Sequence, residues 1–490
     1  MGTLFAKTKC DHVPFTIIND PVHGYIELHP LLFKIMNSYH FQRLKDIKQL
    51  GITYWVFPGA SHNRFEHSIG TSHLCGRMID ILRKRHKKKE NGKISITKVE
   101  SLCVKVAGLC HDLGHGPFSH FFDEEYLPRV TSPRSDWKHE QSSCELFDFM
   151  LEENKELNEE FEKYGLKKKE QRFIKDLILG KKSEEAEEKK SSIVYEDRND
   201  GKMYKKSFLY EIVNNKRNGI DCDKFDYFAR DCYNVGIQSN FDCQRYFHTT
   251  RIMPIGDELQ ICVRDKEVFN LYQLFHTRSS LHQRVCQHKT KAPIEDMLAE
   301  ALSKVDRKFK ISSSINDIRR FTKLTDNIVY DICKSESNDE ETEAAKDLLL
   351  KIQNRNLYKL CGEIYLPQTD SKESLFGLER EDIKYTIRDY IRAESKNPKM
   401  LSGQIFVSVA VIDSTQEGKD PIKCVNFFNK SGKLITIPDE QLKQMGPAVL
   451  VRKIVRVYAK SPEYRDEVRN CFKEMCGKKG YPSVTEKPEE

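Results

Sequence analysis

Four polar side chains that could bind a metal lie close together in the segment 106–120, which reads VAGLCHDLGHGPFSH. An apolar run ends in the adjacent pair His111 and Asp112, and His115 and His120 follow within one short loop. An isolated His-Asp pair is more often a helix cap, but four such groups beside an apolar helix favour binding. A neutral imidazole next to a carboxylate suits a transition metal, and the glycines between them let the backbone approach a bound group.

A hydrolytic metal site needs three or four protein ligands and an open position, so other segments must contribute. Upstream, His67 lies three residues after Arg64, which places both on one side of a helix. Downstream, a helical segment carries four aspartates, and Asp223, Tyr227 and Asp231 share one face through their spacing of four residues. Two imidazoles and two carboxylates suit Fe, Mn, Co or Zn better than Ca. Such a metal would activate water toward phosphorus, and Arg64 offers a fork for phosphate.

Length and composition limit the possible classes of protein. The 490 residues exceed one ordinary core and predict two or three domains. There is no run of about 18 apolar residues and no signal peptide, so we expect no membrane span. The 15 cysteines are scattered and indicate reduced thiols in a nuclear or cytoplasmic protein. The net charge of +7 permits an anionic ligand without establishing nucleic-acid binding.

The hydrophobic pattern predicts a mainly α-helical chain with strands near its C-terminus. A short hairpin is expected over 15–30 and a strand over 54–60, whereas the charged stretch 181–206 predicts a mobile surface insertion. The expected helices lie at 30–36, 39–50, 64–85, much of 99–230, 266–306, 315–360 and 462–477. The strands expected after residue 400 lie at 404–412, 425–428 and 451–458.

Taken together, these motifs resemble a known family. The order of His67, the pair His111 and Asp112, and Asp223 is similar to the H…HD…D signature of the HD phosphohydrolase superfamily. Longer stretches resemble the SAM-and-HD-domain deoxynucleoside triphosphate triphosphohydrolases of vertebrates. These stretches are NDPVHG from residue 19, FPGASHNRFEHS from 57, LCHDLGHGPFSH from 109, KRNGIDCDK from 216 and DKEV from 265.

The pattern and the resemblance together imply a helical HD phosphohydrolase core over residues 15–365, which includes the insertion 181–206. An N-terminal segment 1–14 precedes it, and a smaller α+β C-terminal lobe at 366–478 and a disordered tail at 479–490 follow. The SAM domain of the family has no counterpart in the sequence, so we expect a shortened form or a paralogue that lacks it.

The resemblance implies metal-dependent cleavage of deoxynucleoside triphosphates (dNTPs) at the α-phosphorus, which gives a deoxynucleoside and inorganic triphosphate. The implied ligands of one Zn, Fe or Mn ion are His67, His111, Asp112 and Asp223, with Mg bridging the nucleotide phosphates. The family has a catalytic histidine in a Trp-x-His-Glu segment, which corresponds here to His139 beside Glu140. The implied neighbouring acid-base and phosphate-contacting residues are His115, His120 and Asp123, and imidazole has a suitable pKa for this role.

Substrate contacts are also implied by the resemblance. Tyr227 would pack on the deoxyribose where a 2′-hydroxyl would otherwise lie, and Asp231 would bind the 3′-hydroxyl, although spacing alone fits a core position for Tyr227. The remaining implied contacts to base, sugar and phosphates are Gln49, Leu50, Arg64, His115, His120, Lys224, Arg278, His282 and Gln287. The family has a base-facing tyrosine where this chain has Cys286, so we expect altered base affinity or preference.

The family is activated by nucleotides that bind between subunits and assemble a homotetramer from a dimer. A dNTP activator site is implied at Val56, Phe57, Asp242, Arg245, Arg264, Lys266, Asn270, Arg284, His288 and Lys289. A guanine-nucleotide site is implied at Thr16, Ile17, Asn37, Gln42, Lys45, Arg355, Lys359 and Lys430. Thr16, Asn37 and Lys45 stand where the family has Lys, Asp and Arg. Asn37 offers guanine one acceptor instead of two, and Lys45 lacks the planar fork, so we expect altered or lost GTP activation.

Two alternatives stay open at this point. One is another HD phosphohydrolase, such as a nucleotidase or a cyclic phosphodiesterase, which the sugar contacts implied for Tyr227 and Asp231 disfavour. The other is a single-stranded nucleic-acid-binding restriction factor that kept the fold, which the intact metal set disfavours. The family is associated with limiting dNTP pools and viral replication, so a role in antiviral defence and innate immunity is also implied.

Overall fold

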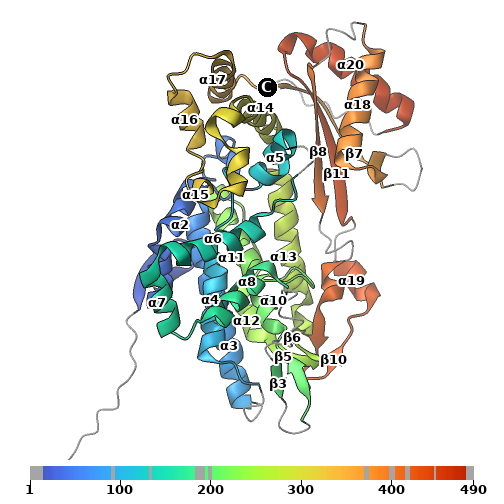
Figure 1. Cartoon of the computed structure of the whole chain (residues 1–490). Helices are drawn as coiled ribbons and strands as arrows, with labels where there is room; N and C mark the ends of the chain where they lie inside the picture. Colours follow the sequence, from blue (N-terminus) through green and yellow to red (C-terminus); the bar gives the residue numbers. More distant parts are fainter. Residues whose placement is uncertain are drawn as a thin grey trace, which may run out of the picture.

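The computed structural model describes residues 15–89, 94–131, 135–181, 194–196, 201–368, 375–396, 403–413, 420–445 and 449–481. Most of these residues are helical, which confirms the predicted mainly α class. Figure 1 shows an elongated helical body with a smaller lobe of strands and helices beside its upper half. The predicted N-terminal segment 1–14 and most of the predicted tail lie outside the described residues.

Three helices form the centre of the larger body: α3 (Arg64–Lys89), α4 (Lys98–Cys110) and α11 (Cys222–Val235). Helix α4 is buried along most of its length because it is apolar on nearly every side, and Thr97 begins it with a capping box. The side chain of Asp221 caps α11. Helix α3 packs against both partners, so the ends of these helices lie close to one another.

Shorter helices surround this centre. They are α1 (Pro30–Met36), α2 (Tyr39–Gln42), α5 (Leu127–Val130), α6 (His139–Glu153), α7 (Lys155–Lys163), α8 (Lys168–Leu179), α10 (Phe208–Val213), α12 (Cys243–Thr249), α13 (Val268–Leu281), α14 (Lys291–Phe309), α15 (Ile318–Phe321), α16 (Ile328–Lys334) and α17 (Glu340–Gln353). Two π-helical turns, η3 (Phe122–Tyr126) and η5 (His282–Cys286), widen the helical backbone locally. Such turns recur at functional sites.

Two sheets belong to the larger body. Strands β1 (Thr16–Asp20) and β2 (Gly24–Leu28) form the predicted antiparallel hairpin. A second sheet has the order β10-β9-β6-β4-β3, with β5 also paired to β6. Its members are β3 (Val194–Glu196), β4 (Met203–Lys205), β5 (Thr250–Ile255), β6 (Glu258–Arg264), β9 (Asn426–Phe428) and β10 (Leu434–Ile435). Strands from the insertion and from the C-terminal part of the chain therefore complete a sheet built on β6.

The C-terminal lobe contains an antiparallel sheet with the order β7-β11-β8. Its strands are β7 (Lys359–Leu366), β8 (Ile405–Asp413) and β11 (Val451–Ala459), and α18 (Arg380–Glu394) and α20 (Arg465–Lys479) pack on it. The lobe has its own apolar core. By contrast, Ile422 and Phe427 join the core of the larger body, as does Leu442 of α19 (Asp439–Met445).

Two expectations for the N-terminal region are wrong. The helix predicted over 39–50 ends at Gln42 and continues only as a 3-10 turn to Asp46, because Ile47 is extended and Lys48 bridges to Asn63. The strand predicted over 54–60 is absent from this described stretch. Gly51, with φ of +52°, begins a 3-10 turn that runs to Trp55 instead.

Two later expectations are partly wrong. In the insertion 181–206, strands β3 and β4 pair and join the large sheet, whereas 182–193 and 197–200 lie outside the described residues. The helical region predicted over 315–360 is divided into α15, α16 and α17 and ends before β7. Arg355, with φ of +59°, turns the chain out of helical conformation there.

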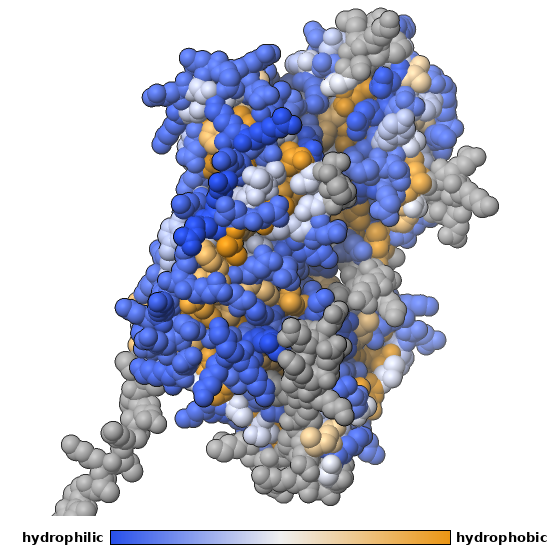
Figure 2. All heavy atoms as spheres, in the orientation of Figure 1, coloured by the Kyte–Doolittle hydropathy of each residue, from blue (hydrophilic) through white to orange (hydrophobic). Residues whose placement is uncertain are grey.

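Within the described part of the chain, no helix has the length and apolar character needed to cross a membrane. Figure 2 shows hydrophilic side chains over most of the visible face, with apolar groups in smaller patches.

The contact between α3 and α11 yields a prediction about stability. A β-carbon at Gly70 would lie 1.9 Å from Asp226 Oδ1, whereas one at Gly76 would meet only the flexible side chain of Lys105. We expect Gly70→Ala to lower the free energy of unfolding by about 2 kcal/mol or more through overpacking. We expect Gly76→Ala to change it by less than about 1 kcal/mol, because alanine favours helix. Urea unfolding of both variants measures the difference, and equal stabilities would contradict the close packing of α3 on α11.

Candidate metal centre and adjoining pocket

The predicted metal ligands meet where three helix ends converge. His67 lies in the first turn of α3 and Asp223 in that of α11, whereas His111 is the C-cap of α4 and Asp112 follows it. His67 Nε2 lies 3.0 Å from Asp223 Oδ1 and 3.4 Å from Asp112 Oδ2. His111 Nε2 lies 3.3 Å from Asp112 Oδ1 and 3.3 Å from Asp223 Oδ1. His67, His111 and Asp223 can therefore reach one ion, and Asp112 lies beside them within 3.4 Å of both imidazoles.

The electrostatics of this cluster fit a divalent cation. Burial lowers the pKa of His67, but hydrogen bonds to Asp223 and Asp226 outweigh it and raise the pKa to about 10. The ring therefore lies where positive charge is strongly favoured. Among the described residues, His111 Nε2 is buried without a hydrogen-bond partner, although it faces two carboxylates. A cation shared by two imidazoles and two carboxylates satisfies all of these groups, and this donor set suits a transition metal.

Asp226 is a functional residue that the sequence analysis did not single out. His67 Nδ1 and His23 Nε2 are hydrogen-bonded to its carboxylate at 2.7 and 2.6 Å. Arg230 donates to both oxygens of Asp226 at 2.9 Å and to Asp20 at 2.9 Å. A carboxylate on one nitrogen of a ligand imidazole fixes its tautomer and directs the other nitrogen to the metal. The available signal was its place three residues after the ligand aspartate of α11.

A second cluster of histidines lies beside the metal ligands. His115 stacks on His139 with ring centroids 3.9 Å apart, and His115 Nε2 lies 3.3 Å from Asp112 Oδ1. Asp123 Oδ2 lies 3.4 Å from His139 Nδ1 and 3.7 Å from His120 Nδ1. Burial and nearby cations hold the pKa of His115 well below its ordinary value, whereas hydrogen bonding to Asp123 raises the pKa of His120 against the effect of burial. Two imidazoles whose pKa values are shifted in opposite directions thus lie side by side, with ring centroids 5.1 Å apart.

The loop 113–120, which carries part of this cluster, is held in a strained conformation. Phe118 and Ser119 have φ of +58° and +59°, which is costly for residues other than glycine. Buried Arg43 donates to two carbonyl groups of this loop at 3.1 and 2.8 Å. Asp326 accepts the Phe118 N–H at 2.6 Å. Arg43 and Asp326 were missed by the sequence analysis because they lie far from the loop in sequence, and no local motif connects them.

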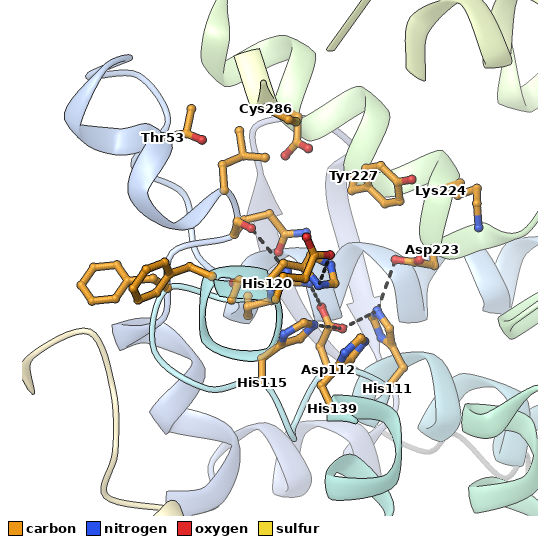
Figure 3. Close-up of a pocket in the computed structure, with 18 of the residues that line it drawn as sticks. Thr53, His111, Asp112, His115, His120, His139, Asp223, Lys224, Tyr227 and Cys286 are labelled. Carbon is orange, nitrogen blue, oxygen red and sulfur yellow. Dashed lines mark hydrogen bonds and ion pairs between the residues drawn. The ribbon is translucent and has the colours of Figure 1, made fainter. Parts of the chain in front are cut away.

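A cavity of about 490 Å³ opens beside both clusters (Figure 3). It is lined by every predicted substrate contact, namely Gln49, Leu50, Arg64, His115, His120, Lys224, Tyr227, Asp231, Arg278, His282, Cys286 and Gln287. His139 and Glu140 line it too. Figure 3 shows Asp112, His111 and Asp223 at one end, Tyr227 beyond them and Cys286 farther away. The helical face predicted for α11 thus faces the cavity, and the contacts to substrate remain predictions.

Among the cationic side chains that line the cavity, Arg64, Lys224 and Arg278 are those predicted to bind phosphate groups. Arg64 Nη1 donates to Asp112 Oδ2 at 2.7 Å, and Lys224 Nζ lies 3.3 Å from Asp221 Oδ2. Within the described residues, Arg278 Nε is buried without a hydrogen-bond partner. Because an unmet charged donor in a cavity is costly, Arg278 is the cation best suited to receive an anion.

Three further side chains that line the cavity have a defined orientation or protonation state: Asp231, Tyr227 and His282. His62 Nε2 is hydrogen-bonded to Asp231 Oδ1 at 2.6 Å, which orients this carboxylate. Burial raises the pKa of the Tyr227 phenol, so the ring stays neutral. Burial and the charge of Arg278 lower the pKa of His282 to about 4, so this imidazole is also neutral near pH 7.

The residues predicted for the dNTP activator fall into two groups within one chain. The rings of Phe57 and His288 are in edge-to-face contact, with centroids 5.5 Å apart, and the neighbouring members are Val56, Arg284 and Lys289. Asp242 caps α12 and is hydrogen-bonded to Asn270 at 3.0 Å, and the neighbouring members are Arg245, Arg264 and Lys266. Asn270 and Arg284 are separated by the length of α13 and its π-helical turn, roughly 20 Å at the rise of a helix.

The residues predicted for guanine-nucleotide activation are also dispersed. Gln42 Nε2 donates to the carbonyl of Met36, beside Asn37, and Lys45 lies over the ring of Phe65 at 4.7 Å. The remaining members lie in β1 (Thr16 and Ile17), after α17 (Arg355), in β7 (Lys359) and after β9 (Lys430). Figure 1 places α17 and β10 at opposite ends of the molecule, so these residues do not form one site within a single chain.

Comparisons with known proteins agree with this geometry. The family model described as HD domain matches residues 64–200, which contain His67, His111 and Asp112. The chain is 41% identical over 483 residues to the deoxynucleoside triphosphate triphosphohydrolase SAMHD1 of Homo sapiens, covering 95% of this chain and 74% of that protein. It is 34% identical over 461 residues to the SAMHD1 homolog of Dictyostelium discoideum, covering 94% and 80%. It is 32% identical over 422 residues to an HD domain-containing protein of Acanthamoeba polyphaga mimivirus, covering 84% of each chain.

The contacts of Asp226 yield a prediction about metal binding. We expect Asp226→Asn to weaken metal affinity by roughly 10- to 100-fold, because the charge that orients His67 is lost. Asp20→Asn is the matched control, since Asp20 also binds Arg230 but does not contact His67. Metal content after dialysis against graded chelator measures both variants, with circular dichroism to confirm folding. Retention of metal by Asp226→Asn at the level of Asp20→Asn would contradict the orienting role.

Proposed function

The chain belongs to the deoxynucleoside triphosphate triphosphohydrolase family of HD-domain proteins, and we propose how its cavity binds and cleaves the substrate. The enzyme hydrolyses deoxynucleoside triphosphates to the deoxynucleoside and inorganic triphosphate. The observation that supports a site for this reaction is the convergence of His67, His111, Asp112 and Asp223 beside a cavity of about 490 Å³.

The residues present fit one divalent metal, and we propose Zn, Fe or Mn at the four ligands, with Mg bridging the nucleotide phosphates. When bound, such a metal supplies Lewis acidity toward a phosphoryl group and makes water acidic near neutral pH. Arg64, Lys224 and Arg278 would bind the phosphates as cations, with Arg278 Nε contributing a donor that otherwise lacks a partner. The triphosphate would therefore extend from the metal ligands toward Arg278.

We propose that the histidine cluster moves the proton that the reaction needs. Cleavage at the α-phosphorus forms a bond from water oxygen to phosphorus and breaks the bond to the 5′-oxygen of the sugar. The leaving oxygen must take up a proton, and imidazole is suited to give it near neutral pH. His139 lines the cavity, stacks on neutral His115 and lies 3.4 Å from Asp123 and 3.6 Å from Glu140. We assign proton delivery to His139, which Asp123 and Glu140 would hold in position.

The sugar contacts distinguish this reaction from the other HD phosphohydrolase activities. Tyr227 lines the cavity in the turn of α11 after Asp223, and its partly buried ring would occupy the space beside the sugar C2′. Asp231 is held by His62 and would accept the 3′-hydroxyl. A ribonucleotide would then meet the ring of Tyr227 with its additional hydroxyl group.

One incubation tests the proposed site. Wild-type protein given four dNTPs should release inorganic triphosphate, whereas Asp223→Ala should lose bound metal and lower turnover by at least about 1,000-fold, because one ligand is removed. Asp466→Ala, an exposed carboxylate in α20, is the control and should retain both metal and turnover. Triphosphate is followed by ion chromatography and metal by mass spectrometry. Release of monophosphate instead of triphosphate would point to another nucleotidase reaction, and salt-dependent binding of single-stranded nucleic acid without turnover would point to a binding protein.

We further propose that nucleotides control oligomerisation. The two groups that contain Phe57 and Asp242 lie at opposite ends of α13, so a nucleotide could contact both only across subunits of a homotetramer. Control of dNTP pools against viral replication, in the nucleus or cytoplasm, is the cellular role that we propose.

The substitutions at the guanine-nucleotide site yield a prediction about activation. We expect wild-type protein to show weak or no stimulation by GTP, because Asn37 presents guanine with one acceptor and Lys45 lacks a planar fork. The double variant Asn37→Asp with Lys45→Arg should increase stimulation by about tenfold or more, since a bidentate pair is worth about 1–3 kcal/mol. Initial rates with and without GTP at fixed dNTP measure this. A strict GTP requirement in the wild type would contradict the prediction.

A further inference from the structure

We propose that Lys291 and Glu295 select the base of the substrate and favour guanine, an inference that rests on the proposed function of the cavity. Both side chains line the cavity, and both come from the first turns of α14. Neither residue belongs to the metal centre or to the histidine cluster described above. They form an ion pair with each other, one turn apart on the same helix.

The pair lies at the end of the cavity that a base would occupy. Lys291 begins α14, just after the π-helical turn that ends at Cys286, and Cys286 lies far from the metal-binding side chains in Figure 3. With phosphates at the metal end and the sugar at Tyr227, the base is directed toward Cys286. The small side chain there leaves room for a purine, and burial raises the pKa of its thiol to about 12, so it carries no charge.

The distribution of charge along the cavity supports this orientation. Arg64 contacts the metal ligand Asp112, and Lys224 follows the metal ligand Asp223 in α11, whereas Glu295 lies in α14, beyond the turn that contains Cys286. A second hollow of about 50 Å³ borders Glu124, Lys291 and Glu295 and extends to β8 of the C-terminal lobe. A nucleotide with its phosphates near the metal ligands therefore presents its base edge to the Glu295 carboxylate and the Lys291 ammonium group.

Guanine matches this pair better than the other bases do. Its edge presents an acceptor, O6, next to two donors, N1–H and the N2 amino group. Lys291 can donate to O6 while Glu295 accepts from both donors, and Lys-to-guanine O6 and carboxylate-to-amino contacts are established modes of base recognition. Thymine presents an acceptor, a donor and an acceptor, so one of its carbonyl groups would face the carboxylate. Adenine and cytosine each offer only one amino donor beside an acceptor.

The burial of the pair gives these contacts their discriminating power. Each side chain is 17% exposed, and Lys291 is the one ion-pair partner of Glu295 within the described residues. The carboxylate has a second oxygen and the ammonium has further N–H groups that remain available to a ligand. A site that hydrogen-bonds its substrate rejects an analogue that leaves those groups unpaired. Selectivity should therefore appear as faster turnover of dGTP relative to dTTP.

Internal competition tests the inference without interference from activation. All four dNTPs at equal concentration are given to one enzyme sample, and their loss is followed by liquid chromatography. Because every substrate meets the same activated enzyme, the ratio of rates gives the ratio of kcat/KM. We expect dGTP to exceed dTTP by roughly tenfold or more. The double variant Lys291→Met with Glu295→Gln, which keeps the net charge, should bring the ratio within about threefold of unity.

Two further variants make the outcome specific. Glu300→Gln is the matched control on α14, since Glu300 pairs with Lys460 and does not line the cavity. It should keep the dGTP preference. The single variant Glu295→Gln should lose the preference even if the double variant folds poorly, and circular dichroism checks both.

The competition experiment distinguishes failure of the base-selection proposal from failure of the proposed function. A wild type that consumes the four dNTPs at equal rates overturns base selection and leaves the proposed function intact. A dGTP preference that survives in the double variant overturns the role of this pair. Absence of turnover for every dNTP overturns the proposed function, and base selection falls with it.

Discussion

A buried carboxylate between α3 and α11 fixes the position of the metal centre. Asp226 binds His67, which would hold the metal, and also His23 and Arg230. The cationic partners offset the cost of burying its charge. Gly70 lets the two helices approach because no side chain separates them from this cluster. The geometry of the centre thus depends on a contact one layer behind the ligands.

The same contact connects the metal centre to the N-terminal hairpin. His23 lies in the turn between β1 and β2, and Asp20 at the end of β1 receives a hydrogen bond from Arg230. The hairpin is therefore anchored on the charges that orient His67. Arg43 similarly holds the strained loop 113–120, which carries His115, by donating to its carbonyl groups. Asp226 and Arg43 thus position His67 and His115, although neither is proposed to contact the substrate.

The sequence allowed the ligand set and most helices to be predicted, because each rests on a local signal. An apolar helix that ends in a His-Asp pair, and a face defined by Asp223 and Tyr227, are visible without knowledge of the fold. Asp226 and Asp326 could not be assigned, since their roles depend on partners that are distant in sequence. In the sequence, the spacing of Lys291 and Glu295 is typical of an ion pair on an exposed helix face. The fold is needed to place this pair in the cavity.

The wrong predictions of secondary structure also arise from contacts between segments that are distant in sequence. The stretch 54–60 has the composition of a strand, but a strand needs a neighbour, and none reaches this described segment. In the insertion, strands form where composition predicts none, because β4 pairs with β6 and β3 pairs with β4. Arg355, whose φ is positive, ends the last predicted helix before β7.

The sheet built on β6 has a consequence for how the chain can be divided. Strand β9 pairs with β6 although more than 150 residues lie between them in sequence, and these include β7, α18 and β8 of the separate C-terminal core. Cutting the chain at the start of the C-terminal lobe would strip this edge and leave unpaired amide and carbonyl groups open to other molecules. The lobe is therefore not a separable domain, because a segment within it packs on the larger body before the chain returns to β11, and the two parts are expected to fold as a single cooperative unit.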